Sequence, residues 1–330
     1  MIRTNKLQVA KRWIDNADSV LIVAGAGMSV KKGEMVYVNT DDFAKHYPFF
    51  LKWGYRTGYE GMGLMFDPSV PDTAKWGYWA HHLRNSRYVF EPNDGYETLL
   101  NMLKDKDYFV MTSNTDGCFE RSGFDKDRIY TAQGDFNYFQ CFPNPCRPDA
   151  VFEAGPTLEK LHKNVDKDGN VPESMIPKCK YCGGKVFGNV RFGGGFCHYV
   201  YEEQNDVFRK WLMEKMDSKA GNVAILEIGA GFNTPIVTRI PAESFARDLG
   251  SRGHFIRINP SDPKVPSDIN ALSFSEGWQV LNEIQDTKLP DDYQVDDDTL
   301  NSLKSGSSVH ARRYPRLAWD EMWKHLKDRY

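Results

Sequence analysis

Short runs of consecutive apolar residues, separated by stretches with helical periodicity, are the main pattern along the chain. Such runs suit strands that are buried on both faces, and they occur at residues 18–23, 108–112, 128–131, 223–228 and 254–258. Apolar residues spaced three or four apart predict helices at 6–16, 95–104 and 208–216. Strands that alternate with helices favour an α/β fold with a doubly wound, Rossmann-like parallel sheet.

Two insertions and a tail interrupt this alternation. The aromatic-rich segment 36–90 predicts a small helical insertion beside a ligand cleft, and segment 141–185 carries most of the cysteines. From residue 286 the chain is polar and acidic, with a final helix predicted at 319–330. The predicted domains are therefore a discontinuous nucleotide-binding domain (1–35, 91–140 and 186–285), a helical insertion (36–90), a metal-binding module (141–185) and a C-terminal extension (286–330).

Composition narrows the classes of partner. The chain has 330 residues, 41% of them hydrophobic, and a formal net charge of -3. Attraction to nucleic acid or to a membrane surface requires a surplus of basic residues, so we expect neither partner. No apolar run approaches the roughly 18 residues that cross a bilayer, and the first residues do not resemble a signal peptide. We expect an intracellular, cytoplasmic protein.

Two glycine-containing loops follow apolar strands. One runs from Ala24 through Gly25, Ala26 and Gly27 to Met28, and a second contains Gly229, Ala230, Gly231 and Asn233. Glycines at such a turn let the backbone approach a pyrophosphate, whose charge suits the N–H groups at a helix N-terminus. A pair of glycines also serves an ordinary strand-to-helix corner. Two such loops on one sheet favour a crevice for a dinucleotide.

A polar segment follows the run at 108–112. Asn114 and Asp116 stand at the carboxyl end of this strand, where α/β sheets bind ligands, and either side chain can hydrogen-bond a ribose or hold a nicotinamide. The same residues equally suit an Asx turn and a helix cap before Phe119. Both interpretations remain open on the sequence.

Four of the six cysteines form two close pairs. Cys141 and Cys146 are separated by four residues, and Cys179 and Cys182 by two, with glycines directly behind. Two such pairs can place four thiolates around a structural zinc ion. The alternatives are free thiols or two disulfides. Cys118 and Cys197 lie apart from these pairs, and we interpret them as buried or incidental.

The order of these motifs resembles the sirtuin family. Segments 112–117, 122–124 and 129–134 follow the order of the sirtuin core, residues 25–29 match its opening loop, and Asn259 lies in a segment similar to its late adenine-side loop. The resemblance covers roughly residues 8 to 280. It implies that NAD is the nucleotide, that Asn259 joins the nucleotide-binding residues, and that the four paired cysteines form the zinc ribbon of the family.

Three departures from the usual sirtuin pattern make the chain similar to the class M sirtuins. Gln133 stands where sirtuins usually have a histidine base, segment 34–43 lacks the usual Asp-Phe-Arg, and residues 229–231 replace the common Gly-Thr-Ser. This resemblance implies ADP-ribosylation of a protein substrate, a lipoylated carrier similar to the glycine-cleavage H protein. It also implies a macrodomain partner that hydrolyses the modification.

The resemblance suggests a role for each polar residue. The amide of Gln133 has no useful proton affinity near neutral pH, so we expect it to hydrogen-bond the ribose or the acceptor. Asn114 would position the nicotinamide ribose or a water, and Asp116 would orient nicotinamide. Arg191 is a weaker candidate, for which a surface salt bridge is favoured over substrate contact. The competing functions are NAD hydrolysis, protein deacylation and non-catalytic sensing of NAD or ADP-ribose.

Overall fold

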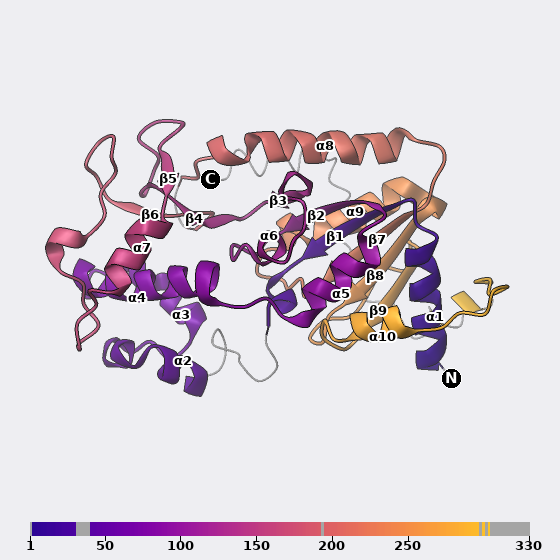
Figure 1. Cartoon of the computed structure of the whole chain (residues 1–330), viewed down its shortest axis with the longest axis horizontal. Helices are drawn as coiled ribbons and strands as arrows, with labels where there is room; N and C mark the ends of the chain where they lie inside the picture. The colour runs from indigo at the N-terminus through magenta and orange to yellow at the C-terminus, as the bar shows by residue number, and fades with distance from the viewer. Residues whose placement is uncertain (1, 31–39, 193–194, 297–298, 301–302, 304–330) are drawn as a thin grey trace.

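The computed structural model describes residues 2–30, 40–192, 195–296, 299–300 and 303 (Figure 1). The helix predicted at 319–330 therefore lies outside the described residues, as does most of segment 34–43. Within the described part of the chain, no helix is both long and apolar enough to cross a bilayer.

The largest unit is a six-stranded parallel sheet with the strand order β3-β2-β1-β7-β8-β9. Its strands are β1 (Ser19–Ala24), β2 (Asp107–Thr112), β3 (Ile129–Thr131), β7 (Val223–Ile228), β8 (Gly253–Ile258) and β9 (Ala271–Phe274). All five neighbouring pairs are parallel. The predicted α/β fold with a Rossmann-like sheet is confirmed, and five of these strands match the predicted apolar runs. The short strand β9 was not predicted.

Helices cover both faces of this sheet, because alternate side chains of each strand point to opposite faces. In β1, Val20 and Ile22 pack on one side with three helices, which are α1 (Ile2–Asp15), α5 (Asp94–Leu103) and α10 (Val280–Asp286). Leu21 and Val23 pack on the other side with α8 (Glu202–Asp217) and α9 (Arg239–Leu249). The helices predicted at 6–16, 95–104 and 208–216 correspond to α1, α5 and α8.

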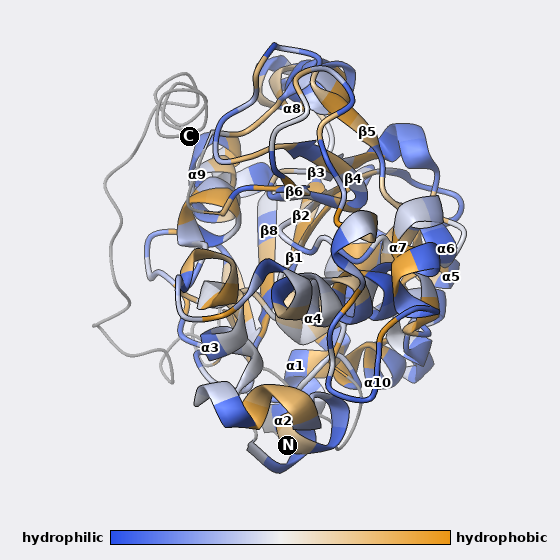
Figure 2. Ribbon diagram, turned by 90° about the vertical axis from the view of Figure 1, so that its left-hand side faces the viewer, coloured by the Kyte–Doolittle hydropathy of each residue, from blue (hydrophilic) through white to orange (hydrophobic). Residues whose placement is uncertain are grey.

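The two insertions pack around one further hydrophobic core. A three-stranded antiparallel sheet has the order β5-β4-β6, with β4 at Gly134–Cys141, β5 at Val151–Glu153 and β6 at Val186–Val190. Helices pack with it, chiefly α4 (Asp72–Arg84) and α7 (Gly155–His162), together with α2 (Thr40–His46) and α3 (Gly58–Met62). When the molecule is viewed from the side of the insertions, α4 lies in front of the parallel sheet (Figure 2). The separate boundaries at 36–90 and 141–185 stay predictions.

Candidate active site

The two glycine loops touch each other at the carboxyl ends of β1 and β7. A Cβ atom built on Gly25 would lie 2.6 Å from the carbonyl oxygen of Gly229, and one on Gly27 would lie 2.7 Å from the Cα atom of Gly229. Gly229 itself has a φ of +62°, which side chains rarely adopt. These glycines therefore allow backbone-to-backbone contact between the loops. Contact with a pyrophosphate, the reason expected from sequence, stays a prediction.

The first glycine loop contains a short 3-10 turn where the sequence predicted the start of a helix. Residues Ala26–Met28 form one 3-10 turn, with Ala26 exposed and Met28 fully buried. The carbonyl oxygen of Met28 accepts a hydrogen bond of 2.7 Å from Asn93 Nδ2, at the start of α5. The carbonyl of Ala24 accepts one of 3.0 Å from the amide of Ser113. Main-chain groups of this loop are thus fixed by neighbours on both sides.

Asn114 is anchored to this same loop. Its side chain is 8% exposed, and Nδ2 donates hydrogen bonds of 3.0 Å to the carbonyl oxygen of Gly25 and to Ser29 Oγ. The Ser29 hydroxyl in turn donates to Asp116 Oδ2 at 2.6 Å and lies 2.7 Å from the Tyr96 hydroxyl. The Asn114 nitrogen is thus held by the protein, and contact of its Oδ1 atom with a ligand stays a prediction. Ser29 and Tyr96 were not predicted from sequence.

Asp116 forms the Asx turn that the sequence allowed, while its contact with a ligand stays a prediction. Its Oδ1 accepts a hydrogen bond of 2.9 Å from the backbone N–H of Cys118, the first residue of the short helix α6 (Cys118–Arg121). Its Oδ2 belongs to the polar network with Ser29. Burial raises the pKa of Tyr96 well above its usual value, so this hydroxyl stays protonated and can donate toward Ser29. The carboxylate of Asp116 is thus fixed at both oxygens.

Gln133 is held from the other side of the site. Its Nε2 donates a hydrogen bond of 2.7 Å to the carbonyl oxygen of Arg191, and the amide of Arg191 returns one of 2.9 Å to the carbonyl of Gln133. Arg191 is only 6% exposed; its Nε donates to the carbonyl of Ala132 at 3.0 Å, and its guanidinium lies 4.2 Å from the ring centre of Phe196. The surface position favoured for Arg191 was therefore wrong, because backbone and aromatic partners bury it.

The sheet brings Asn114 and Gln133 to one edge. Thr112 and Thr131 are partners in adjacent parallel strands, and each candidate residue follows its strand by two positions. Asn114, but not Gln133, lines a cavity whose other residues are mainly polar and include Asp116 and Thr131. Arg87 and Asp135 also line it, and neither was a candidate in the sequence. The geometry joins the predicted site residues of β2 and β3.

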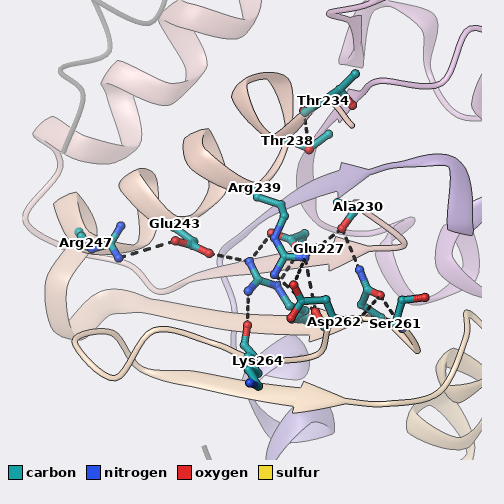
Figure 3. Close-up of polar contacts among 12 residues, drawn as sticks. Glu227, Ala230, Thr234, Thr238, Arg239, Glu243, Arg247, Ser261, Asp262 and Lys264 are labelled. Atoms are coloured by element: carbon teal, nitrogen blue, oxygen red, sulfur yellow. Dashed lines mark hydrogen bonds and ion pairs between the residues drawn. The ribbon is translucent and has the colours of Figure 1, made fainter. Parts of the chain in front are cut away.

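A second polar network holds the loops after β7 and β8 (Figure 3). Asn259 Nδ2 donates to the carbonyl of Ala230 at 2.8 Å, and its Oδ1 accepts from the backbone N–H of Asp262 at 3.0 Å. Arg239, which is 2% exposed, donates to the carbonyls of Ala230 and Asp262 at 3.2 and 3.4 Å. Gly231 and Asn233 in the same loop are exposed. Nucleotide binding by Asn259 stays a prediction, and Arg239 was not predicted from sequence.

The four paired cysteines come together at one place. Their sulfur atoms all lie within 4.8 Å of one another, with 3.5 Å between Cys141 and Cys182 and 3.8 Å between Cys146 and Cys179. A zinc ion with Zn–S bonds of about 2.3 Å requires sulfur atoms about 3.8 Å apart, so the donor set fits a tetrahedral site. A disulfide requires about 2.05 Å, and all six cysteines are free thiols. Cys118 and Cys197 are buried elsewhere, as expected.

The fold and site define an α/β protein with a Rossmann-like parallel sheet and a four-cysteine module. No protein-family model matches the chain. A probable bifunctional ADP-ribose hydrolase/ADP-ribosyltransferase of Fusarium oxysporum f. sp. cubense is 35% identical over 256 residues, which span 76% of this chain but 42% of that protein. A protein ADP-ribosyltransferase of Staphylococcus aureus is 26% identical over 273 residues, 81% of this chain and 82% of its own length.

Solved structures give the same fold. The complex of a mutant Sir2 homologue with ADP-ribose superposes with a TM-score of 0.51 at 18% identity, over 84% of this chain and 94% of that one. At this identity the likeness concerns the fold alone, while the sequence relatives add the link to named ADP-ribosyltransferases. The chain therefore has a Sir2-like Rossmann fold.

Proposed function

We propose that this protein is an NAD-dependent protein ADP-ribosyltransferase of the class M sirtuin type. The observation that carries the proposal is the pairing of a fixed Asn114–Ser29–Asp116 network with an amide, Gln133, at the adjacent strand end. Both curated relatives described above carry ADP-ribosyltransferase in their names. The Staphylococcus relative supports the assignment along most of the chain.

The chemistry needs no strong base at position 133. In the transfer, the bond between the nicotinamide nitrogen and the ribose breaks, and its electron pair leaves with nicotinamide. A protein nucleophile then forms the new bond at the same carbon and loses its proton to water. Asn114 Oδ1 positions the ribose or a water, Asp116 orients nicotinamide, and Gln133 hydrogen-bonds the ribose or the acceptor. Positioning of this kind contributes much of a rate enhancement.

The nucleotide would extend from this site across the two glycine loops. Ala24, Gly25, Ala26, Gly27 and Met28 form one wall of the proposed NAD site. The other wall is formed by Gly229, Ala230, Gly231, Asn233 and Asn259. The contact between the loops and the bond from Asn259 to Ala230 give this crevice a fixed floor. A preformed site lowers the ordering cost of binding.

We further propose a protein acceptor, a lipoylated carrier similar to the glycine-cleavage H protein, and a macrodomain hydrolase that removes the mark. The name of the Fusarium relative couples ADP-ribose hydrolysis with ADP-ribosyl transfer. The matched residues span 42% of that protein. The sulfur spacing of Cys141, Cys146, Cys179 and Cys182 supports a structural zinc ion beside the transferase core.

The test incubates the purified protein with NAD labelled in the ADP-ribose part and a lipoylated carrier. Nicotinamide release and the intact mass of the carrier are measured together. Asn114→Ala and Gln133→Ala should each lower labelling at least tenfold. The matched controls remove an exposed amide of the same type, through Asn101→Ala in α5 and Gln279→Ala before α10, and should label normally.

Each alternative function gives a different product. Free ADP-ribose without a mass increase of the carrier would identify a hydrolase, and intact NAD would identify a sensor. Turnover of an acetyl-lysine peptide would identify a deacylase. Full labelling by both Asn114→Ala and Gln133→Ala would remove the proposed roles of these residues.

A further inference from the structure

Arg87 is a buried cation that the reaction outlined above does not use. It lies in a five-residue π-helix, Asn85–Val89, which directly continues α4 of the helical insertion. The residue is 6% exposed, so its charge requires partners. A single turn of π-helix within a chain of α-helix often marks a functional position.

Two carboxylates meet this guanidinium. Arg87 Nε donates to Asp135 Oδ1 at 2.8 Å, and Nη2 donates to Glu120 Oε2 at 2.6 Å. Asp135 is buried, whereas the Glu120 side chain is 52% exposed. Burial raises the pKa of Asp135, and the neighbouring Arg87 opposes this rise.

The partners of Arg87 belong to both halves of the candidate active site. Asp135 follows Gln133 by two residues, and Glu120 lies in α6, the helix that begins directly after the Asp116 loop. Gly117 gives a third link. A Cβ atom there would lie 2.2 Å from Arg87 Cζ, and φ is +64°. The guanidinium therefore packs directly on the backbone between Asp116 and α6.

We propose that Arg87 is a positioning residue that sets the spacing between the Asp116 loop and the Gln133 loop. The inference rests on the proposed transferase function, and it gives the helical insertion a role in the reaction. Arg87 lines the same cavity as Asn114 and Asp116. Within the described residues its hydrogen bonds go to Asp135 and Glu120 and not to the glycine loops, so its loss should affect turnover more than NAD binding.

Arg87→Lys tests the proposal because it retains the charge but cannot form the planar two-armed contact. A displacement of about 1 Å at a reacting centre can cost on the order of a hundredfold in rate. We expect kcat for nicotinamide release to fall at least tenfold while the KM for NAD changes less than twofold. Arg84→Met is the matched control, since this arginine of α4 pairs with Glu159 outside the site and should retain normal kcat.

The outcomes distinguish failure of the proposed transferase function from failure of the proposed role of Arg87. If the wild type releases no nicotinamide and labels no carrier, the proposed function fails. If the wild type is active and Arg87→Lys keeps its kcat, or loses kcat and NAD affinity equally, the positioning role fails. Should Arg87→Lys fold poorly, as judged by thermal unfolding, Glu120→Gln replaces it. That variant loosens the exposed arm, and an unchanged kcat there would also overturn the proposal.

Discussion

A charge cluster buried between β7, β8 and α9 allows the sharpest prediction about stability. Arg257 Nε and Nη2 contact the two carboxylate oxygens of Glu227 at 2.6 and 2.8 Å, and Nη2 also reaches Glu243 at 2.8 Å (Figure 3). Arg257 Nη1 donates to the carbonyl of Lys264. Arg257 is 1% exposed and Glu227 is completely buried. The charges in this cluster are therefore stabilised by one another and not by water.

The perturbation is Arg257→Met, which fills a similar volume but removes the cation. It leaves Glu227 without its counterion and removes one from Glu243. Breaking a buried ion pair on one side costs about 3–5 kcal/mol, because the remaining charge keeps its desolvation penalty. An exposed pair contributes at most about 1 kcal/mol. Arg3, whose side chain is 46% exposed in its pair with Glu276, provides that comparison through Arg3→Met.

The assay is urea unfolding followed by circular dichroism at neutral pH, with midpoints compared at a common m-value. Arg257→Met should lose about 3–5 kcal/mol and Arg3→Met less than about 1 kcal/mol. Adding Glu227→Leu to Arg257→Met should recover part of the loss, since it removes a buried unpaired carboxylate. Equal losses for the two single variants, or no recovery in the double variant, would refute the reasoning.

Three further predictions concern metal, backbone and pH. One zinc equivalent should copurify with the protein and be lost with Cys179→Ser but not with Cys197→Ser, as measured by metal analysis. Gly229→Ala should weaken ADP-ribose binding and cost about 1–3 kcal/mol, whereas Gly63→Ala, outside the proposed site and with open space around it, should do neither in calorimetry and thermal unfolding. Burial lowers the pKa of His82 to about 4, so below pH 6.5 the unfolded state takes up a proton that the folded state does not, and the free energy of unfolding falls. His82→Gln should remove about 2 kcal/mol of the destabilisation seen between pH 7.5 and 5.

Much of the parallel sheet could be predicted from sequence because buried parallel strands are continuous apolar runs. The strand β9 escaped because its four residues, Ala271–Phe274, include a serine and give too short a run. The antiparallel sheet escaped for another reason. In this sheet Cys141 of β4 pairs with Val186 of β6, which is distant in the sequence. No local sequence pattern predicts such a long-range pairing.

Part of the candidate site could likewise be predicted from local sequence patterns, and part could not. Glycines, strand-end amides and paired cysteines are local patterns; the structure brings the four cysteines together and the two glycine loops into contact. Arg191 and Arg239 were misjudged or missed because their charge suggests exposure. Both are instead buried by bonds to backbone carbonyls and by aromatic rings, those of Phe196 and Phe232. Long amphipathic side chains of this kind cannot be placed without the tertiary structure.

The hydrogen bonds of Gln133 have a consequence for the proposed reaction. Its Nε2 is committed to the carbonyl of Arg191, so the amide cannot turn freely and its Oε1 occupies a fixed place. An amide oxygen accepts a hydrogen bond but takes up no proton near neutral pH. A reaction that depends on Gln133 therefore gains orientation from it and no base. The acceptor must lose its proton by itself or to water, so the choice of nucleophile lies with the protein substrate.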